Sequence, residues 1–306
     1  MKKETGYIVV CYVIWGIFPL FWNLLLDVDS YCLLGWRALW SGVVAAVLIG
    51  YSHLWKQLWE TLKNPRLTAR IMTAGLLIYV NWGVYIWCNT HGHRLDCSLA
   101  YYMTPLISIL LGLFFFRERL DLRQWLAVGI TLCGVVYTVA VAGEMPWISF
   151  VLGGSFALYG AVKKPLKVPF QIVLAIELLA VAPISVGILL WSNYSKGIAL
   201  DFVAMGGQAW LIPISGVVTV VPLVFFAKGI AKTSMTLVGI LMYMNPTLQM
   251  LMALLLGDVL TGDDIVLFVF VWLGVLVYIV PEIWQLSKQK GERVCESSVV
   301  LPEGDA

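Results

Sequence analysis

Charged residues are scarce in this chain. Of its 306 residues, 12% are Asp, Glu, Lys or Arg, whereas 60% are hydrophobic. A soluble globular domain carries about 25% charged residues, so this chain has too few to cover a water-facing surface of its size. The composition excludes an ordinary soluble protein and predicts a polytopic membrane protein. The net charge of +2 is also too small to attract nucleic acid.

Signatures of catalysis and of cofactor binding are missing as well. The six cysteines form no Cys-x-x-Cys pair and no metal-like spacing with the three histidines. There is no Gly-rich phosphate loop that ends in Lys-Ser or Lys-Thr. An intramembrane protease would need a serine with a buried base or two buried aspartates, but each His and Asp lies near a loop, at a helix end or in the last segment. The sequence therefore predicts no enzyme, no metal and no cofactor.

Long apolar runs dominate what is present. About 20 apolar residues are needed to cross a hydrocarbon core as a helix. Two runs start directly after a lone charge, Arg37 or Glu177, and are expected to extend back to about 31 and 170. The fold class is predicted to be all-α, with ten transmembrane helices. The runs free of charged residues are 5–26, 38–55, 71–93, 97–116, 124–143, 145–162, 178–195, 202–227, 233–257 and 265–281.

The distribution of Lys and Arg predicts the orientation, because cytoplasmic loops carry the excess of positive residues. With the N-terminus inside, the outer loops hold only Arg94 and Lys196. Both termini are therefore predicted to be cytoplasmic, and 285–306 is predicted to be a disordered cytoplasmic tail. The inner segments would then hold Lys2, Lys3, Lys56, Lys63, Arg66, Arg70, Arg117, Arg119, Arg123, Lys163, Lys164, Lys167, Lys228, Lys232, Lys288, Lys290 and Arg293.

The chain contains a weak internal repeat. "YVIWGIFPL" (12–20) aligns with "FALYGAVKK" (156–164), and "AYYMTPLISILLG" (100–112) aligns with "LMYMNPTLQMLMA" (241–253). "LCGVVY" (132–137) aligns with "WLGVLV" (272–277). Because five helices form an odd number, the second copy must enter the membrane from the opposite side. We predict two inverted five-helix repeats, 1–143 and 144–284, which is a transporter architecture with its site between the halves.

Several segments resemble one family. "NWGVYIWCNTHGHRLDCSLAYYMTPLISILLGLFFFRERLDLRQWLAVGITLCGV", "WRALWSG", "SFALYG" and "GVVTVVPLVFFA" are similar to RarD-type permeases of the EamA branch of the drug/metabolite transporter superfamily. The resemblance implies ten helices, cytoplasmic ends and solute transport across a bacterial inner membrane. It suggests an amino-acid-like or nucleotide-derived solute, or a drug such as chloramphenicol. The chain departs from the family pattern at Trp36, Thr104 and Met242, where polar side chains are usual.

Two charges lie well inside predicted helices. Arg37 and Glu177 occupy equivalent positions in the two halves, 140 residues apart, with opposite signs. A charge in hydrocarbon is costly and is usually functional or paired. Three alternatives remain open: the side chains reach the nearer interface or backbone carbonyls, they line the transport path, or they pair with each other. On the path, Arg37 would suit an anionic group and Glu177 a cation or a coupling proton.

Polar and aromatic residues of the runs 5–26, 71–93 and 97–116, with their repeat mates, are expected to line a cavity. An alternative for the aromatic residues is that they face lipid or the core. Pro105 and Pro246, which are repeat mates, are expected to act as hinges because a proline frees a backbone carbonyl one turn earlier. The predicted substrate-binding residues are Trp15, Arg37, Asn81, Trp82, Tyr85, Tyr102, Thr104, Tyr159, Glu177, Tyr243 and Asn245.

These features together predict a secondary transporter. It would move a small organic metabolite or drug across the cytoplasmic membrane by alternating access, driven by protons or by a counter-substrate. Its partners would be that solute and the lipid bilayer. The alternatives are a non-transport membrane subunit or sensor and, last, an intramembrane enzyme.

Overall fold

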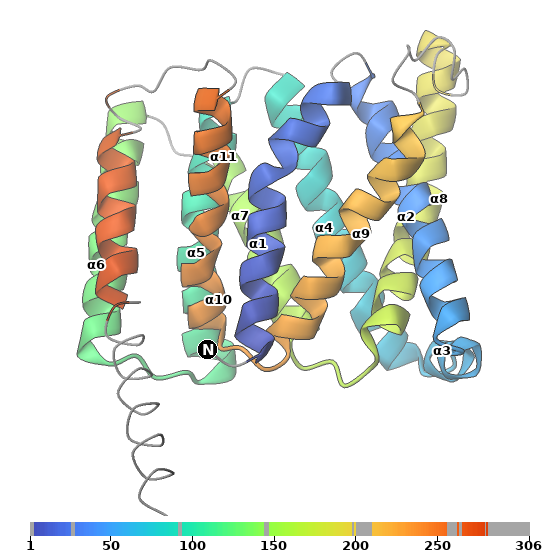
Figure 1. Cartoon of the computed structure of the whole chain (residues 1–306), viewed down its shortest axis with the longest axis horizontal. Coiled ribbons are helices and arrows are strands. Elements are labelled where there is room, and N and C mark those ends of the chain that lie inside the picture. Colours follow the sequence, from blue (N-terminus) through green and yellow to red (C-terminus); the bar gives the residue numbers. More distant parts are fainter. Residues whose placement is uncertain are drawn as a thin grey trace, which may run out of the picture.

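A computed structural model describes residues 3–25, 28–90, 94–143, 147–197, 199, 210–255, 262, 265–278 and 280, and all regular structure in these residues is helical (Figure 1). The predicted tail at 285–306 lies outside the described residues. The C-terminal helix, which carries no label, spans Ile265–Tyr278. The other helices are α1 (Lys3–Trp22), η1 (Asn23–Leu25), α2 (Ser30–Tyr51), α3 (Trp55–Leu62), α4 (Pro65–Thr90), α5 (Arg94–Phe116), α6 (Leu122–Ala142), α7 (Trp147–Lys163), α8 (Phe170–Lys196), α9 (Leu211–Ile230), α10 (Met235–Met242) and α11 (Met244–Leu255).

Apolar helices account for the ten predicted spans. Within the described residues, seven stretches are long and apolar enough to cross a membrane, with α10 and α11 counted as one stretch, Met235–Met252. Three shorter apolar helices, Ala100–Phe116, Trp147–Lys163 and Ile265–Tyr278, complete the set. The prediction of an all-α polytopic membrane protein is confirmed.

One helix was not predicted. The run at 38–55 was expected to be a single span, but α2 ends at Tyr51 and is followed by α3, which Figure 1 shows end-on, lying across the bundle. Leu58 and Leu62 of α3 pack against the core, while Trp55 and Trp59 are exposed. This arrangement is typical of a helix that lies in the membrane interface. The sequence did not predict α3, because the charged residues that follow the run are typical of a loop.

Helices of the two predicted halves pack mainly against each other. α4 contacts α7 and α8, α2 contacts α8 and α9, and α1 contacts α9 and α11. The predicted repeat makes α7 the mate of α1, α9 the mate of α4, and α11 the mate of part of α5. The contact of α4 with α7 then corresponds to that of α9 with α1, and the contact of α5 with α7 corresponds to that of α11 with α1. The boundary between the halves is therefore the main packed interface of the molecule.

The pair formed by α6 and the C-terminal helix stands at one end of the molecule (Figure 1). Its contact is reciprocal. A Cβ added at Gly134 would lie 2.7 Å from the Cβ of Phe270, and a Cβ added at Gly274 would overlap Oγ1 of Thr131. The two glycines are 140 residues apart, and each allows the partner helix to approach closely.

The two predicted hinge prolines differ. Pro105 lies inside α5, which continues from Arg94 to Phe116. Pro246 is the third residue of α11, directly after the break at Tyr243 that separates α10 from α11. In the first turn of a helix, proline loses no intrahelical hydrogen bond. The helix is therefore interrupted at only one of these two equivalent positions.

Candidate functional site

Glu177 is neutralised inside its own half. Nζ of Lys163 lies 2.9 Å from Oε1 and donates a 2.9 Å hydrogen bond to Oε2. The same ammonium donates to the hydroxyl of Tyr159 at 2.5 Å. The Lys163 and Glu177 side chains are 3% and 4% exposed. This corrects two sequence-based expectations: Lys163 is not a loop residue, and the partner of Glu177 is Lys163 rather than Arg37.

The reason lies in the length of α7. This helix continues to Lys163, one residue beyond the charge-free run, and ends there. Lys163 stands four residues after Tyr159, so both side chains lie on one face of the helix. α8 brings Glu177 to that face. In the sequence, a lysine at the end of an apolar run is typical of a cytoplasmic loop. Only the packing of α7 on its neighbours shows that Lys163 is buried.

Among the described residues, Arg37 has no carboxylate partner. Its guanidinium carbon lies 4.4 Å from the ring centre of Trp82 on α4 and 5.2 Å from the ring centre of Trp22 at the end of α1. Its Nε is buried and donates no hydrogen bond. Cation–π contacts hold the charge, but they leave the hydrogen-bonding capacity of the guanidinium unused.

A second donor lies close by on the same helix. Nε1 of Trp40, one turn after Arg37, is also buried without a hydrogen-bond acceptor. On the other side, Tyr79 is buried one turn before Trp82, and its hydroxyl accepts a 2.9 Å hydrogen bond from Ser185. The surroundings of Arg37 are therefore aromatic, and they offer donors without acceptors.

A small cavity lies between Glu177 and Trp82, the residue whose ring contacts Arg37. Its volume is about 10 Å³, close to what one water molecule occupies. Three successive turns of α4 form one wall, and a Cβ added at Gly75 would lie 2.6 Å from the backbone of Glu177. Seven residues separate Gly75 from Trp82, which is about 10 Å at 1.5 Å per residue. The cavity is lined by Gly75, Ile78, Tyr79, Trp82, Glu177, Leu178, Val181 and Leu223.

Most of the other predicted polar residues form hydrogen bonds within the protein. Nδ2 of Asn81 donates to the carbonyl of Leu152 at 2.7 Å and so joins α4 to α7. The hydroxyl of Thr104 donates to a carbonyl of its own helix at 2.7 Å. Oδ1 of Asn245 accepts a 2.8 Å hydrogen bond from Gln249. These polar groups are engaged within the protein, which sets them apart from Arg37.

Two predicted aromatic residues belong to one cluster around Phe226. Trp15 lies with its ring 5.9 Å from that of Phe226, and Tyr159 stacks on Phe226 with ring centres 5.6 Å apart. Tyr85 lies elsewhere, with its ring 6.0 Å from that of Tyr101. The cluster brings Trp15 to the Glu177 end of the cavity, while Tyr85 belongs to a separate contact between α4 and α5.

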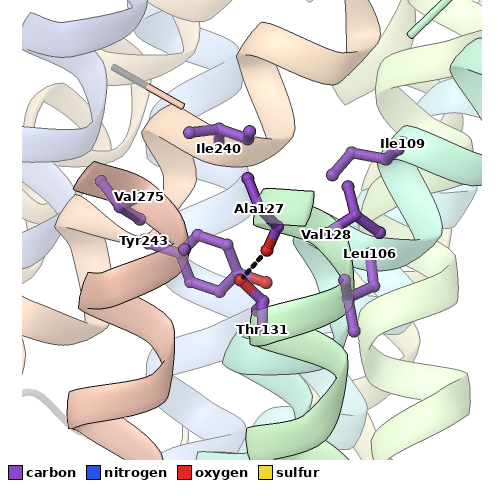
Figure 2. Close-up of a pocket in the computed structure, with 9 residues that line it drawn as sticks. Leu106, Ile109, Ala127, Val128, Thr131, Ile240, Tyr243 and Val275 are labelled. Carbon is purple, nitrogen blue, oxygen red and sulfur yellow. Dashed lines mark hydrogen bonds between the residues drawn. The ribbon is translucent and has the colours of Figure 1, made fainter. Parts of the chain in front are cut away.

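Tyr102 and Tyr243, which are repeat mates, meet across the two halves. The hydroxyl of Tyr243 donates to the backbone carbonyl of Tyr102 at 3.2 Å. Figure 2 shows Tyr243 at a second small cavity, between α5, α6, α10 and the C-terminal helix, where Thr131 donates to the carbonyl of Ala127 at 3.0 Å. This cavity is otherwise apolar, so the tyrosine pair is best understood as part of the helix packing.

Sequence reasoning missed three residues of the site. Trp22 and Tyr79 were not singled out, and Lys163 was assigned to an inner segment outside the membrane. For Tyr79 a signal existed, since it stands one turn before Trp82. Among the described residues, no group of three or more His, Cys, Asp or Glu could hold a metal ion.

Comparison with known proteins identifies the family. Residues 3–140 match the model of the EamA-like transporter family. The chain is 34% identical to "Uncharacterized transporter YojE" of Bacillus subtilis over 94% of this chain and 97% of that protein. It is 32% identical to "Protein RarD" of Salmonella typhimurium over 92% and 96% of the two chains.

A solved crystal structure shares the fold. It is 17% identical in sequence and superposes with a TM-score of 0.68, covering 90% of this chain and 96% of that one. Similarity at this level supports the fold alone. The sequence relatives carry the assignment further, because they span nearly the whole chain at over 30% identity. The chain belongs to the EamA-like transporter family as a RarD-type member, and it is a membrane transporter.

Proposed function

We propose that this transporter moves a small organic solute by alternating access, with the solute bound between two inverted five-helix repeats at Arg37 and Trp82. The observation that carries the proposal is the buried Nε of Arg37, which has no acceptor and lies between two tryptophans. A permanent charge in the hydrocarbon costs about 3 kcal/mol or more. A ligand that pairs with Arg37 offsets that cost, whereas a purely structural role would be fulfilled by an apolar residue.

Contacts at both ends of the bundle support alternating access. At the end where α10 begins, the carboxylate of Glu118 accepts hydrogen bonds from the backbone N–H groups of Met235 (2.7 Å) and Thr236 (3.0 Å). At the end where α2 begins, Asp29 pairs with Lys196 at 2.5 Å. Each contact joins one half to the other. A transporter of this kind would break the contacts at one end of the bundle while keeping those at the other end, so that the site opens to one side at a time.

For energy coupling, Glu177 is the candidate proton carrier and a counter-substrate is the alternative. Glu177 is the one carboxylate that the described residues bury almost completely. Its Oε1 lies beside an ammonium but receives no well-directed hydrogen bond. Protonation of the carboxylate would break the ion pair with Lys163 and change the charge of the α7–α8 contact. That change would couple a proton to a rearrangement of these helices.

The proposed orientation places both termini in the cytoplasm and the protein in a bacterial inner membrane. The excess of Lys and Arg in the inner segments supports this orientation, and removing Lys163 from that set leaves the asymmetry intact. Under this orientation, α3 with its exposed Trp55 and Trp59 lies at the cytoplasmic interface, where tryptophans are enriched.

The experiment is an uptake measurement without a preselected substrate. Proteoliposomes with the purified protein are incubated with a bacterial metabolite extract, and the lumen is analysed by mass spectrometry. We expect one or a few solutes to accumulate, and to accumulate less with Arg37→Gln. Arg66→Gln is the matched control, because Arg66 is exposed at the start of α4. If no solute enters beyond empty liposomes, the transport proposal fails and a sensor or regulatory subunit becomes the better explanation.

A further inference from the structure

We infer that the solute is an organic monoanion, a carboxylate attached to an aromatic ring. This inference rests on the proposed function and names the solute class of the same site. It depends on the charge balance of the protein interior, on the donors left without acceptors and on the rings beside them.

The charge balance leaves one positive charge. Lys163 and Glu177 are the two charged residues that the described part of the chain buries almost completely, and they pair with each other. Arg37 pairs with no carboxylate of the described residues, and its guanidinium contacts Trp22 and Trp82 instead. The interior therefore holds Lys163 (+1), Glu177 (−1) and Arg37 (+1), a sum of +1. A ligand with a charge of −1 would balance it.

The buried donors that have no partner call for a ligand with hydrogen-bond acceptors. Nε of Arg37 and Nε1 of Trp40 lie one turn apart on α2 and are both buried without a partner. An ionised carboxylate has two acceptor oxygens and no donor. Its planar geometry also matches the fork of a guanidinium. A cationic ligand would repel Arg37, and a neutral ligand could accept from these donors but would leave the positive charge without a counter-charge.

The aromatic rings beside Arg37 indicate the chemistry of the rest of the ligand. Trp22 and Trp82 lie within 5.2 Å of the guanidinium carbon, and the ring of Tyr79 is 6.5 Å from that of Trp82. A ligand carboxylate bound to Arg37 brings its own substituent against these rings. An aromatic substituent gains from ring contacts and fits an apolar wall. A phosphate monoester is disfavoured, since it carries a charge closer to −2 and would leave an excess negative charge.

The glutamate end of the cavity supports the same conclusion. A cationic solute would need Glu177 as its counter-ion, but that carboxylate already has Lys163 at 2.9 Å and lies in the same cluster as Tyr159. Displacing Lys163 would leave a buried ammonium without its partner. Among the described residues, Arg37 is the buried charge that has no counter-ion for a ligand to displace.

The test is a matched series of probes on the full-length protein in nanodiscs. The probes are phenylacetate and indole-3-acetate, their neutral amides, phenethylamine and phenyl phosphate. Binding is measured as a thermal shift and as quenching of tryptophan fluorescence, because two tryptophans flank the site. We expect the acids to bind, and each other probe to bind about tenfold to a hundredfold more weakly, in the range of one hydrogen bond to a charged group.

Variants assign the effect to Arg37. Arg37→Gln should remove the preference for the acid over its amide, Arg37→Lys should keep part of it, and Arg66→Gln should keep all of it. Fluorescence-detected size exclusion establishes that each variant is folded. Equal binding of acid and amide to the folded wild type, tighter binding of the amine or the phosphate, or no binding of either acid would overturn the inference.

The two proposals fail in different ways. If the proteoliposome experiment shows accumulation of a neutral or cationic solute, transport stands and the monoanion class is wrong. If phenylacetate binds with the expected dependence on Arg37 but no solute accumulates, the anion site stands and the transport cycle is wrong.

Discussion

The predicted repeat places Arg37 and Glu177 at equivalent positions of the two halves, but their surroundings in the structure differ. Glu177 has a cation and a tyrosine from α7, so the second half neutralises its own charge. Arg37 has two tryptophans from α1 and α4 and no counter-ion. The repeat therefore sets where a charge lies, while the side chains of the adjacent helices decide whether it is available to a ligand.

The largest expected effect tests whether Glu177 is structurally paired. Lys163→Met leaves a buried carboxylate without a counter-charge, and we expect the free energy of unfolding to fall by about 3–5 kcal/mol. The double variant Lys163→Met with Glu177→Gln removes both charges and should regain most of that loss. Heat-induced unfolding of the purified proteins measures both. Equal destabilisation in the single and double variants would mean that the ion pair contributes little.

The second prediction tests whether Arg37 is the available charge. Arg37→Gln should reduce solute uptake at least about tenfold, a loss of about 1.4 kcal/mol or more. Its free energy of unfolding should not fall, since no ion pair is broken and the cost of a buried charge is removed. Uptake in proteoliposomes and thermal unfolding are compared in one preparation. If the variant transports normally, Arg37 has a structural role and is not the charge that is available to a ligand.

A smaller effect is expected from the aromatic side of the Arg37 site. Trp82→Leu keeps an apolar side chain but removes the ring face beside the guanidinium, a contact worth about 1–2 kcal/mol when it is desolvated. We expect binding of the transported solute to weaken by about fivefold to thirtyfold. Trp55→Leu is the control, because Trp55 is exposed on α3. Similar losses in both variants would indicate a general effect of tryptophan removal.

The smallest effect concerns the ion pair that joins the halves outside the apolar spans. Burial raises the pKa of Asp29, but the hydrogen bonds from Lys196 and from the backbone of Cys32 outweigh it, so the pKa lies below its ordinary value of 3.8. The stabilisation is therefore complete above pH 4 and is lost as the pH falls through the lowered pKa. Lys196 is 44% exposed, so we expect less than about 1 kcal/mol.

Asp29→Asn should flatten this acid dependence. Melting temperatures of the wild type and of the variant, measured from pH 6 down to about pH 3, should converge at the acid end. A wild type whose melting temperature falls no faster than that of the variant would show that the pair between the halves does not contribute.

The candidate site was only partly predictable, and the limits have physical causes. Arg37 and Trp82 were identified because a charge or a tryptophan in the middle of an apolar run stands out. Asn81 and Thr104 were selected for the same reason, but the structure engages them in hydrogen bonds to backbone carbonyls. A polar residue in a span must satisfy its hydrogen bonds, and sequence position does not reveal whether the partner is the protein or a ligand.

The sequence by itself determined that this chain is a bundle of apolar helices, because 12% charged residues cannot cover a soluble protein of this size. Its weak internal repeat also predicted that Arg37 and Glu177 occupy equivalent positions. The tertiary structure alone decided that Lys163 turns inward to Glu177, that α3 lies across the bundle and that Arg37 keeps no counter-ion. Each of these outcomes depends on which faces of distant helices meet, and helical periodicity leaves that choice open.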